Sequence, residues 1–474
     1  MAETGRIAEY ASPPRGLSRA VLLHTPPGMA PWTFYIVTFG CKVNQYESQA
    51  IREAWQARGG TEAAAPEAAD VVLINSCAVT SRGERDARNA VFRVRRAAPQ
   101  ARIILAGCAA RLFEAFRPRP GAVWATPDLC LGNELKARLL AGPWPFLEEG
   151  GEAPAWPPFR IATFNRARAV LKVQDGCAHR CTYCIVPQTR GAPRSRPPEE
   201  ALAEARALLA AGHAELVISG INLGQYGRDR PEYGDFWQLL RFLDAGLAPE
   251  FAGRARLRIS SLEPSQLDAR GLETLAACRM VCPHLHISLQ HSSPAVLRRM
   301  GRGHYSAADL DTALERVAAF WPLMGLGADI LVGFPGETEE DFRILLETLE
   351  RLPLGYAHVF PYSRRPGTAA AQFAGQLPLK LRQERAAQAR AVVQRRRERF
   401  WEEQLRLPRI LVAPDDGERG TAIPKGVNEY YTPCFFSAPF PAGDGPRHLV
   451  AARPVGVDAR GLVVEAISGA SPLL

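Results

Sequence analysis

Three cysteines fall within eight positions of the segment "LKVQDGCAHRCTYCIVPQTRG", residues 171–191. Cys177, Cys181 and Cys184 have the spacing C-x-x-x-C-x-x-C. A 4Fe-4S cluster is ordinarily held by four protein thiolates, and no fourth cysteine lies near this motif. Three thiolates leave one iron open, and an open iron can chelate a substrate or cofactor through amino and carboxylate groups. The spacing therefore predicts a cluster that does chemistry, rather than one that only carries electrons.

Zinc is the alternative metal for this motif. Structural zinc takes four closed ligands, and His179 could complete such a set with the three cysteines. An ordinary ferredoxin cluster would need a further cysteine close by or one followed by proline, which this segment lacks. The position of the motif directly after a strand-like run, described below, favours the open cluster.

A second set of three cysteines is spread over the first part of the chain. The apolar phrases "TFYIVTFGC", "VVLINSC" and "RIILAGC" end at Cys41, Cys77 and Cys108, which are 36 and 31 positions apart. A single cysteine of this kind is often only a small buried hydrophobic residue. Because the same placement recurs in three successive strand-turn units, a shared ligand role is favoured. Cys130, in "PDLCLGN", lacks the long strand and is left out.

The elements around these cysteines explain how residues so distant in sequence can meet. The intervening segments "ESQAIREAWQARGG" and "SRGERDARNAVFRVRRAAPQ" are helix-like in composition, so strands and helices alternate as in a parallel sheet. Ligands of open α/β sheets bind outside the carboxyl ends of the strands. Residues 32–145 are therefore predicted to form an N-terminal α/β domain that brings the second triad to one edge of its sheet.

A segment rich in Pro, Gly and acidic residues predicts a linker at residues 146–160. From 161 to 400, six strand-like runs alternate with amphipathic helical stretches: "AVLKVQD", "AELVISG", "RLRISSL", "HLHISLQ", "GLGADILVGF" and "YAHVFPY". This alternation predicts an open, partial (βα)6 barrel, short of the eight units of a full barrel. The C-x-x-x-C-x-x-C motif follows the first of these strands, at the carboxyl-terminal mouth where barrel enzymes place their chemistry.

The two ends of the chain are predicted to differ in structure. Residues 1–31 have only a short apolar piece and two Pro-Pro pairs, which predicts a loose extension and no secretory signal. Residues 405–474 contain short strand-like runs broken by Gly and Pro, which predicts a small all-β module. The predicted fold class is therefore α/β, with an N-terminal parallel-sheet domain, a central partial barrel and a C-terminal β module.

Composition bounds the class of protein. The 474 residues are 47% hydrophobic and 23% charged, which is globular usage, and no apolar run approaches the roughly 20 residues that span a bilayer. Ten cysteines without a secretory signal indicate a reducing compartment, so a cytoplasmic location is expected. The net charge is +9, and residues 380–409 carry ten basic against four acidic side chains. That segment would attract a polyanion such as RNA, or it is a solvated helix face.

The first triad, its spacing and its place after a strand resemble the radical S-adenosylmethionine enzymes. What this resemblance implies is that the open iron binds the methionine part of S-adenosylmethionine, which an electron then cleaves to methionine and a 5′-deoxyadenosyl radical. "GADILVGFPGETEEDF" resembles the family's adenosyl-binding segment, and "ISGINLGQYG" resembles the segment near the cofactor's amino group. Residues that end or follow the second to fifth strands are the resulting candidates for S-adenosylmethionine contacts: Gly220, Asn222, Ser261, Glu263, Gln290, Gly333 and Pro335.

A narrower resemblance covers roughly residues 32 to 400. The phrases "VTFGCKVNQYES", "LINSCAVT", "LAGCAAR", "DILVGFPGETEEDF" and "VFPYSRRPGTAA" look like those of the methylthiotransferases. Within that family, "FGCKVNQYES", "SGINLGQYG", "RISSLEP" and "FPYSRRPGT" are most similar to the branch that acts on N6-threonylcarbamoyladenosine beside the tRNA anticodon. The resemblance implies two 4Fe-4S clusters: an auxiliary one on Cys41, Cys77 and Cys108, and a radical-generating one on Cys177, Cys181 and Cys184.

The family resemblance also implies a reaction and its partners. One S-adenosylmethionine methylates a sulfur at the auxiliary cluster, and a second yields the radical that removes hydrogen from C2 of the adenine, a C–H bond that acid-base groups cannot activate. The expected partners are a tRNA anticodon stem-loop, an electron donor of flavodoxin or ferredoxin type and a sulfur donor that the sequence does not identify. The basic segment and a terminal RNA-binding β-barrel, resembling the TRAM module, would contact phosphates.

Several features leave alternatives open. "NEYYTPCFF" departs from the family pattern in the terminal module, so the RNA contacts of that module are left open. Gln188, Thr189 and His291 also depart from the pattern and could shift the substrate to isopentenyladenosine in tRNA or to a ribosomal protein side chain. An iron-sulfur electron carrier or RNA-binding scaffold without catalysis is a further hypothesis. Cys278 and Cys282, in "CRMVC", are interpreted as core residues, and the roles of Cys130 and Cys434 are left unassigned.

Overall fold

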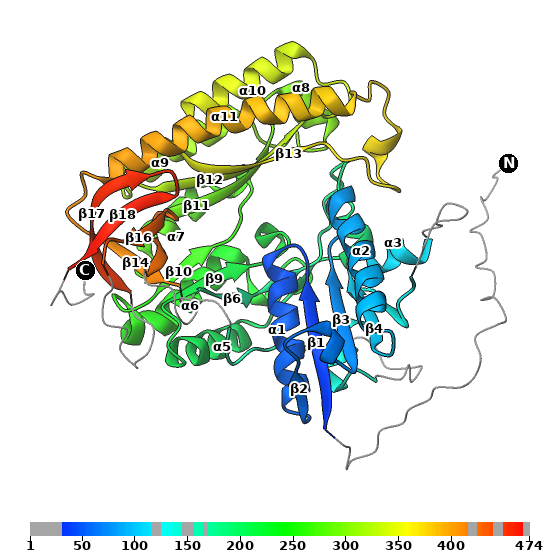
Figure 1. Ribbon diagram of the computed structural model, residues 1–474. Helices are drawn as coiled ribbons and strands as arrows, with labels where there is room; N and C mark the ends of the chain where they lie inside the picture. Colours follow the sequence, from blue (N-terminus) through cyan, green and yellow to red (C-terminus); the bar gives the residue numbers. More distant parts are fainter. Residues whose placement is uncertain are drawn as a thin grey trace.

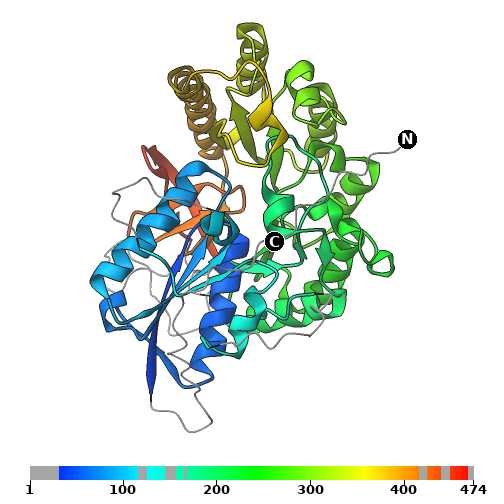
Figure 2. The ribbon, with the colours of Figure 1, turned by 90° about the vertical axis from the view of Figure 1, so that its right-hand side faces the viewer.

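The computed structural model describes residues 31–115, 125–144, 156–164, 168–415, 424–438 and 449–467. All but the last residue of the predicted extension at residues 1–31, and most of the predicted linker at residues 146–160, lie outside these ranges. The described chain forms an N-terminal sheet with helices, a central set of β/α units and a small terminal barrel (Figure 1). Figure 2 shows the N-terminal part, in blue, beside the helices of the central part, in green.

The N-terminal part contains a five-stranded sheet, ordered β2-β1-β3-β4-β5, in which every neighbouring pair is parallel. Its central strand reads "VVLINS" and is buried throughout, which suits a parallel strand covered by helices on both faces. The strands are β1 (Trp32–Thr38), β2 (Gly60–Glu62), β3 (Val71–Ser76), β4 (Arg102–Gly107) and β5 (Leu129–Leu131). The helices are α1 (Lys42–Gln56), α2 (Ser81–Ala97) and α3 (Ala110–Ala115), with 3-10 turns η1 (Pro66–Ala68) and η2 (Lys136–Ala141).

The central part holds the six predicted strands, confirming the (βα)6 pattern. They form two parallel three-stranded sheets, ordered β10-β9-β6 and β11-β12-β13. Single bridges, Leu257 to Val281 and Leu262 to Ile287, join the two sheets near β10 and β11. The strands β6 and β13 are therefore the outer edges of an open half-barrel. The strands are β6 (Arg168–Lys172), β9 (Glu215–Ser219), β10 (Arg256–Ile259), β11 (His284–Gln290), β12 (Gly325–Val332) and β13 (Leu354–Pro361).

Helices cover the outer face of this half-barrel, and their caps follow ordinary sequence signals. Asp235, Ser306 and Thr338 each accept a hydrogen bond from the N3 backbone N–H and complete a capping box. The helices are α4 (Val186–Arg190), α5 (Pro198–Ala210), α6 (Phe236–Phe251), α7 (Ala269–Ala277), α8 (Pro294–Arg299), α9 (Ala307–Ala318), α10 (Glu339–Arg351) and α11 (Leu379–Gln404). Four 3-10 turns, η3 (Leu223–Gln225), η4 (Pro231–Tyr233), η5 (Pro264–Gln266) and η6 (Ala369–Gln372), and a two-stranded antiparallel pair, β7 (Gln174–Asp175) with β8 (Arg194–Ser195), complete this part.

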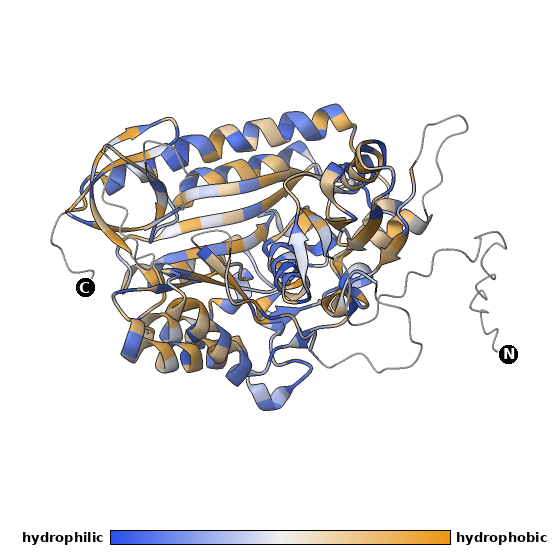
Figure 3. Ribbon diagram, turned by 60° about the horizontal axis from the view of Figure 1, so that its bottom comes forward, coloured by the Kyte–Doolittle hydropathy of each residue, from blue (hydrophilic) through white to orange (hydrophobic). Residues whose placement is uncertain are grey.

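The predicted basic segment is helix α11, and several of its arginines are committed to the fold. Arg385 is buried and donates to Glu337, while Arg382, Arg390 and Arg396 donate to backbone carbonyls of the underlying strand and loop region. Hydrophilic and hydrophobic residues alternate along the helices of the molecule, as Figure 3 shows. The charge excess of this segment is thus partly structural, which the sequence alone did not reveal.

The terminal module is a closed five-stranded barrel, ordered β14-β15-β16-β18-β17, which confirms the predicted all-β module. Its strands are β14 (Ile410–Pro414), β15 (Lys425–Asn428), β16 (Pro433–Phe436), β17 (Val450–Asp458) and β18 (Gly461–Ala466). No helix within the described ranges is long and apolar enough to cross a membrane.

The terminal barrel is fixed to the amino-terminal ends of the half-barrel strands. Arg256 and Arg258, on β10, donate to four carbonyl oxygens of the module, from Leu411 and from residues 427–429, at 2.6 to 2.9 Å. The buried Glu215, on β9, pairs with both arginines. Because breaking a buried ion pair is costly, this contact holds the module rigidly against the half-barrel.

Candidate active site

The C-x-x-x-C-x-x-C loop lies at the carboxyl end of the first half-barrel strand, as predicted. Gly176, just before Cys177, has φ +71°, and a Cβ there would overlap the carbonyl of Ala192. The Cys177 N–H donates to the Gly191 carbonyl at 3.0 Å. The close approach of these two backbones positions the loop and requires glycine at position 176.

Each sulfur of this loop accepts a hydrogen bond from a neighbouring group. Asn222 and Gln225 donate to Cys177 Sγ at 3.9 and 3.5 Å, and Arg302 donates to Cys181 Sγ at 3.5 Å. The backbone N–H of Val186 donates to Cys184 Sγ at 3.4 Å. Donors aimed at thiolate sulfurs suit a metal cluster, because they stabilise the negative charge that such ligands carry.

The pKa values of the three thiols shift in different directions. Burial raises the pKa of Cys184 to about 12 and also raises the pKa of Cys177. Burial acts on Cys181 in the same direction, but hydrogen bonding by His179 and the charge of Arg302 outweigh it and lower the pKa of that thiol. Thiolates that are this strongly disfavoured by burial form readily only with a metal that displaces the proton.

Glu263 is the centre of a polar cluster beside the motif. Its carboxylate pairs with His179 at 3.1 Å, with Arg302 at 3.2 Å and with His304 at 3.2 Å, and it accepts a hydrogen bond from Asn222 at 3.3 Å. Although burial alone would raise it, these partners, led by His179, hold the pKa of Glu263 at about 2. Glu263 is therefore an ionised carboxylate that can accept hydrogen bonds from an ammonium group.

The other predicted cofactor contacts also lie at the carboxyl ends of the strands. Gly220 and Asn222 follow β9, and the N–H of Asn222 donates to Gln174 at 2.8 Å. Ser261 follows β10, and its hydroxyl lies 2.9 Å from that of Ser288 on β11. Gln290 ends β11 with φ +61°, a left-handed conformation that few non-glycine residues adopt.

The turn after β12 contains Gly333 and Pro335. Gly333 has φ +72°, and its N–H donates to the buried carboxylate of Glu337 at 2.7 Å. Glu337 pairs in turn with Arg385 of α11 at 2.7 Å and lies 3.6 Å from His291. His291, which departs from the family pattern, thus lies beside the carboxylate that holds this turn.

The second triad lies at one edge of the N-terminal sheet. Cys77 and Cys108 directly follow β3 and β4, which are paired neighbours, and Cys41 is the N-cap of α1 after β1, on the other side of β3. Gly40 has φ +92°, and a Cβ there would lie 2.8 Å from Cys77 Sγ. This glycine lets the first two cysteine loops approach one another.

The thiols of the second triad are electrostatically coupled. Burial, with smaller contributions from Cys108 and Cys41, raises the pKa of Cys77 to about 11. The amide of Asn133 donates to Cys108 Sγ at 3.3 Å and also to the carbonyl of Thr189, in the half-barrel. Cys41 is exposed and Cys108 is buried, so the triad spans the boundary between solvent and the domain interior.

Five buried charged side chains lie between the two triads. Lys136 and Lys172 contact Glu47 at 2.7 and 2.6 Å, and Lys172 also contacts Asp175 at 2.6 Å. Arg190 contacts Asp175 at 2.9 Å and Glu47 at 3.2 Å. This set, which we term the central charge cluster, joins α1, η2, β6, β7 and α4 and contains three cations for two carboxylates.

The central charge cluster links the two cysteine triads through short stretches of chain. Asp175 lies two residues before Cys177, and Arg190 six residues after Cys184. Arg190 donates to Asn44, three residues after Cys41, at 2.7 Å. The negative potential of Cys108 and Cys41 is among the causes, after Asp175 and Glu47, that raise the pKa of Arg190 against the effect of burial.

Neither triad resembles a single-ion cage. Within the ranges the structure describes, no three His, Cys, Asp or Glu side chains converge on one metal ion. Structural zinc is surrounded by four closed ligands, whereas a four-iron cluster takes each thiolate on a separate iron. The cluster therefore stays the prediction for both triads.

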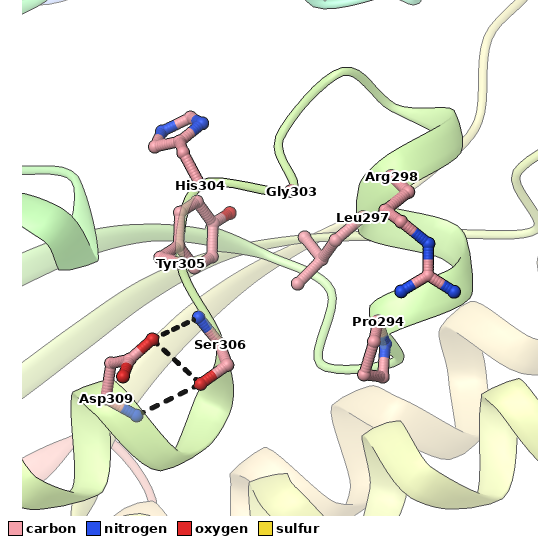
Figure 4. A pocket seen from close by; sticks show the side chains of 8 residues that line it. All are labelled: Pro294, Leu297, Arg298, Gly303, His304, Tyr305, Ser306 and Asp309. Atoms are coloured by element: carbon pink, nitrogen blue, oxygen red, sulfur yellow. Dashed lines mark hydrogen bonds between the residues drawn. The ribbon is translucent and has the colours of Figure 1, made fainter.

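A recess of about 330 Å³ borders the cluster site on its outer side, between α8 and the start of α9 (Figure 4). His304, which contacts Glu263, lies at its edge, and the Ser306–Asp309 capping box forms its base. None of the predicted ligand cysteines lines this recess.

Several functional candidates were not identified from sequence. Arg302 and Gln225 contact the motif sulfurs, and Glu337 supports the predicted adenosyl-binding turn. Arg302 lies 121 residues from Cys181, so no local spacing could have pointed to it. The remaining cysteines agree with their interpretation: Cys282 is buried, and Cys278 packs against the core.

Comparison with known proteins supports the class that this site defines. Residues 171–349 match the model of the Radical SAM superfamily, and residues 33–116 match the model described as Uncharacterized protein family UPF0004. A half-barrel with an open three-cysteine motif at its mouth, matched in this way, is a radical S-adenosylmethionine domain. The cofactors of such a domain are S-adenosylmethionine and a 4Fe-4S cluster.

Curated relatives narrow the class. The chain is 35% identical over 360 residues to the threonylcarbamoyladenosine tRNA methylthiotransferase of Bacillus subtilis (strain 168), covering 73% of this chain and 77% of that protein. It is 32% identical over 368 residues to the tRNA-2-methylthio-N(6)-dimethylallyladenosine synthase of Desulfitobacterium hafniense (strain Y51), covering 74% and 79%. It is 34% identical over 363 residues to the ribosomal protein uS12 methylthiotransferase of Moorella thermoacetica, covering 74% and 81%.

The chain belongs to the radical S-adenosylmethionine methylthiotransferase family, and it is a transferase. The three relatives differ in what their names say they act on, while their identities to this chain differ by only a few per cent. Overall identity therefore gives the family, and the substrate has to be argued from the site.

Proposed function

We propose that this enzyme methylthiolates C2 of N6-threonylcarbamoyladenosine next to the anticodon of tRNA, using two 4Fe-4S clusters. The observation that carries the proposal is the placement of two cysteine triads on either side of the central charge cluster. Two redox-active centres held in one rigid frame suit a reaction that needs both an activated carbon and a sulfur source. The several relatives named for threonylcarbamoyladenosine favour that substrate.

Each triad has a separate role in this proposal. Cys177, Cys181 and Cys184 would hold the cluster that binds S-adenosylmethionine, and the second triad would hold the auxiliary cluster. When bound, these groups supply one-electron chemistry that can remove hydrogen from an aromatic C–H bond and a sulfur that replaces it. The chain's own residues bind, orient and shield them.

The residues at the mouth of the half-barrel would bind S-adenosylmethionine. Glu263 is ionised, so it can accept hydrogen bonds from the ammonium group, and Asn222 lies beside it. Arg302, which contacts both Glu263 and Cys181, would fix the position of the Glu263 carboxylate relative to the Cys181 sulfur. The remaining predicted contacts are Gly220, Ser261, Gln290, Gly333 and Pro335, all at the carboxyl ends of strands.

The terminal barrel and α11 would contact the RNA backbone. Arg453 and Arg460 are 62% and 67% exposed on the barrel, and Lys425 is exposed on β15. On α11, Lys380, Arg395 and Arg399 reach the surface. Exposed cations that neutralise phosphates give affinity that falls with salt and carries no sequence preference.

The proposal includes an electron donor of flavodoxin or ferredoxin type, a sulfur donor of unassigned identity and a cytoplasmic location. A 4Fe-4S cluster accepts one electron at low potential, which suits such a donor. The ten cysteines form no disulfide among the described residues, as expected in a reducing compartment.

A direct assay tests the proposed reaction. The reconstituted enzyme would be given S-adenosylmethionine, a reductant and three separate substrates: an anticodon stem-loop with N6-threonylcarbamoyladenosine, the same RNA with N6-isopentenyladenosine, and ribosomal protein uS12. Mass spectrometry should find a methylthio group on the first substrate and 5′-deoxyadenosine in the mixture. Modification of either other substrate alone would assign the enzyme to that branch, and absence of 5′-deoxyadenosine would support a carrier or scaffold.

A further inference from the structure

The inner face of the sheet β11-β12-β13 is unusual for a barrel. Barrel interiors are ordinarily filled by branched aliphatic side chains. Here the aliphatic residues of these strands, such as Leu285, Ile330 and Val359, pack into the core on the opposite, helix-covered face. The alternate residues form a polar and aromatic surface that we term the histidine ladder: His284, His286, Asp329, Tyr356, His358 and Phe360.

Contacts between its members order the histidine ladder. The hydroxyl of Tyr356 lies 2.8 Å from Nδ1 of His286 and 3.1 Å from Nε2 of His284. The ring centroids of Tyr356 and His358 are 5.6 Å apart, and those of His358 and Phe360 are 6.3 Å apart. Gly327, between them on β12, provides the space, because a Cβ there would overlap the Tyr356 ring.

The histidine ladder is closed at one end and accessible at the other. Tyr431 of the terminal barrel, with φ +67°, places its ring 4.9 Å from His284 and 5.0 Å from Tyr356 and so covers the amino-terminal end. Toward the carboxyl ends of the strands, the Asp329 side chain is 28% exposed and Phe360 is 41% exposed. Polar and aromatic groups are thus presented to solvent on the mouth side.

Both cysteine triads adjoin this face. Lys42, next to Cys41, is exposed. Hydrogen bonding by His286 lowers the pKa of Asp329 against the effect of burial, and burial lowers the pKa of His358; the charge of Lys42 makes a smaller contribution in the same direction to both. On β11 the next inward residue after His286 is Ser288, whose carbonyl accepts a hydrogen bond from Arg302 at 3.1 Å. Arg302 also donates to Cys181 Sγ. The accessible end of the ladder therefore lies between groups tied to each triad.

The chemistry of this face is that of a hydrogen-bonding site with cations at both ends: Arg168 and Arg258 lie against the Tyr431 ring at the closed end, and Lys42 acts on Asp329 and His358 at the accessible end. Asp329 pairs with His286 at 3.2 Å and keeps acceptor capacity for N–H or O–H donors. The Lys42 ammonium can attract a carboxylate, and the exposed Phe360 ring can stack on a nucleobase. An aliphatic substituent placed here would leave these polar groups without partners, which is costly.

We propose that the exposed end of the histidine ladder, Asp329, His358 and Phe360 together with Lys42, binds the target adenosine and its polar N6 substituent. The inference rests on the proposed function and deepens it. A threonylcarbamoyl group brings ureido N–H donors, a hydroxyl and a carboxylate, which match Asp329, His358 and Lys42. An isopentenyl group offers none of these. The ladder is therefore the feature that selects the substituent, while surface cations bind the RNA backbone.

Binding measurements on paired RNAs test the proposal. Two synthetic anticodon stem-loops, identical except for N6-threonylcarbamoyladenosine or unmodified adenosine at the target position, are titrated into the reconstituted enzyme. The wild type should bind the modified RNA at least about tenfold more tightly, as expected when one hydrogen bond to a charged group is gained. The variants Lys42→Met and His358→Ala should bring that ratio close to unity, because they lose affinity for the modified RNA much more than for the unmodified RNA.

Controls separate this inference from the proposed function. Phe242→Ala, at an exposed aromatic residue on α6, should keep the wild-type preference. Iron content and melting temperature of the Lys42→Met and His358→Ala variants should equal those of the wild type, because both side chains are exposed. A preference that persists in both variants overturns the ladder proposal. Equal binding of the two RNAs by the wild type also overturns the ladder proposal, but it is consistent with RNA as the partner of the enzyme. Failure to bind either RNA overturns the proposed function itself.

Discussion

Arg190 is the residue whose surroundings most clearly connect the two triads. It is buried, donates to Asp175, Glu47 and Asn44, and is the last residue of the short helix after the first triad. With the two lysines it leaves the central charge cluster one positive charge in excess beside Cys41 and Cys108. An iron-sulfur cluster on these three thiolates would carry negative charge, and the excess positive charge would stabilise it.

Arg190→Met should destabilise the protein strongly. The substitution removes the charged hydrogen bonds from Arg190 to Glu47 and Asp175, each of which contributes about 1.5–3 kcal/mol, although both carboxylates keep a lysine partner. Chemical denaturation should show the transition at lower denaturant, with less iron bound after reconstitution. Arg190→Lys, which keeps the charge but not the forked geometry, should lose less.

The matched control for Arg190 is Arg343, which pairs with Glu340 and Glu347 on the exposed surface of α10. Arg343→Met should leave the denaturation midpoint unchanged, because solvent screens exposed pairs. If Arg190→Met unfolds at the same denaturant concentration as the wild type, the central charge cluster does not stabilise the contact between the N-terminal domain and the half-barrel.

Replacing Cys41, Cys77 and Cys108 together by alanine should remove one cluster and spare the other. The wild type should bind about eight irons per chain and the triple variant about four, as two 4Fe-4S clusters require. The variant should still form 5′-deoxyadenosine from S-adenosylmethionine, because the half-barrel triad is intact, but should not modify RNA. Iron and sulfide analysis measures the number of irons per chain. The same number in the triple variant as in the wild type would show that Cys41, Cys77 and Cys108 hold no cluster.

At the scale of elements, the attachment of the terminal barrel depends on Glu215. The charges of Arg258 and Arg256 outweigh the effect of burial and hold the pKa of Glu215 far below its ordinary value of 4.5. A carboxyl whose pKa is lowered by folding stabilises the protein above its unfolded pKa, and this contribution is lost as the pH falls below about 4.5.

Glu215→Gln should therefore weaken the protein at neutral pH and flatten its acid response. The loss is expected to be about 3 kcal/mol, because Arg256 and Arg258 stay buried with a weaker partner. Denaturation at pH 7 and at successively lower pH down to about 2 measures both effects, because the Glu215 contribution is lost only below about pH 4.5. A variant that loses stability in acid as steeply as the wild type would assign the acid response to other groups.

The positions of the strands, and the placement of the six cysteines just after strands, could be predicted because each signal is local. A β-branched run followed by Gly-Cys or Ser-Cys marks a strand end, as at Cys77 and Cys108. Six apolar runs that alternate with amphipathic helical stretches define the half-barrel. The central charge cluster could not be predicted, since Glu47 and Lys172 are 125 positions apart. The hydrogen bonds that several α11 arginines make to the protein could not be predicted either, because a charge count does not show which side of a helix packs against the protein.

At the scale of the whole molecule, three parts form one frame around the two triads. The N-terminal domain contacts the half-barrel near β6 through α1. Beyond β13, Ser81 and Glu84 of α2 bind Ser363 and Arg365. The terminal barrel is locked to the opposite end of the strands by Arg256 and Arg258. RNA bound by the terminal barrel and α11 would thus meet the triads at a fixed distance and orientation.

The most direct test of this account is mass spectrometry of tRNA nucleosides from a strain that lacks the gene for this protein. The account predicts that 2-methylthio-N6-threonylcarbamoyladenosine disappears while N6-threonylcarbamoyladenosine accumulates, and that the wild-type gene restores the first nucleoside. An unchanged level of 2-methylthio-N6-threonylcarbamoyladenosine in the deletion strain would contradict it.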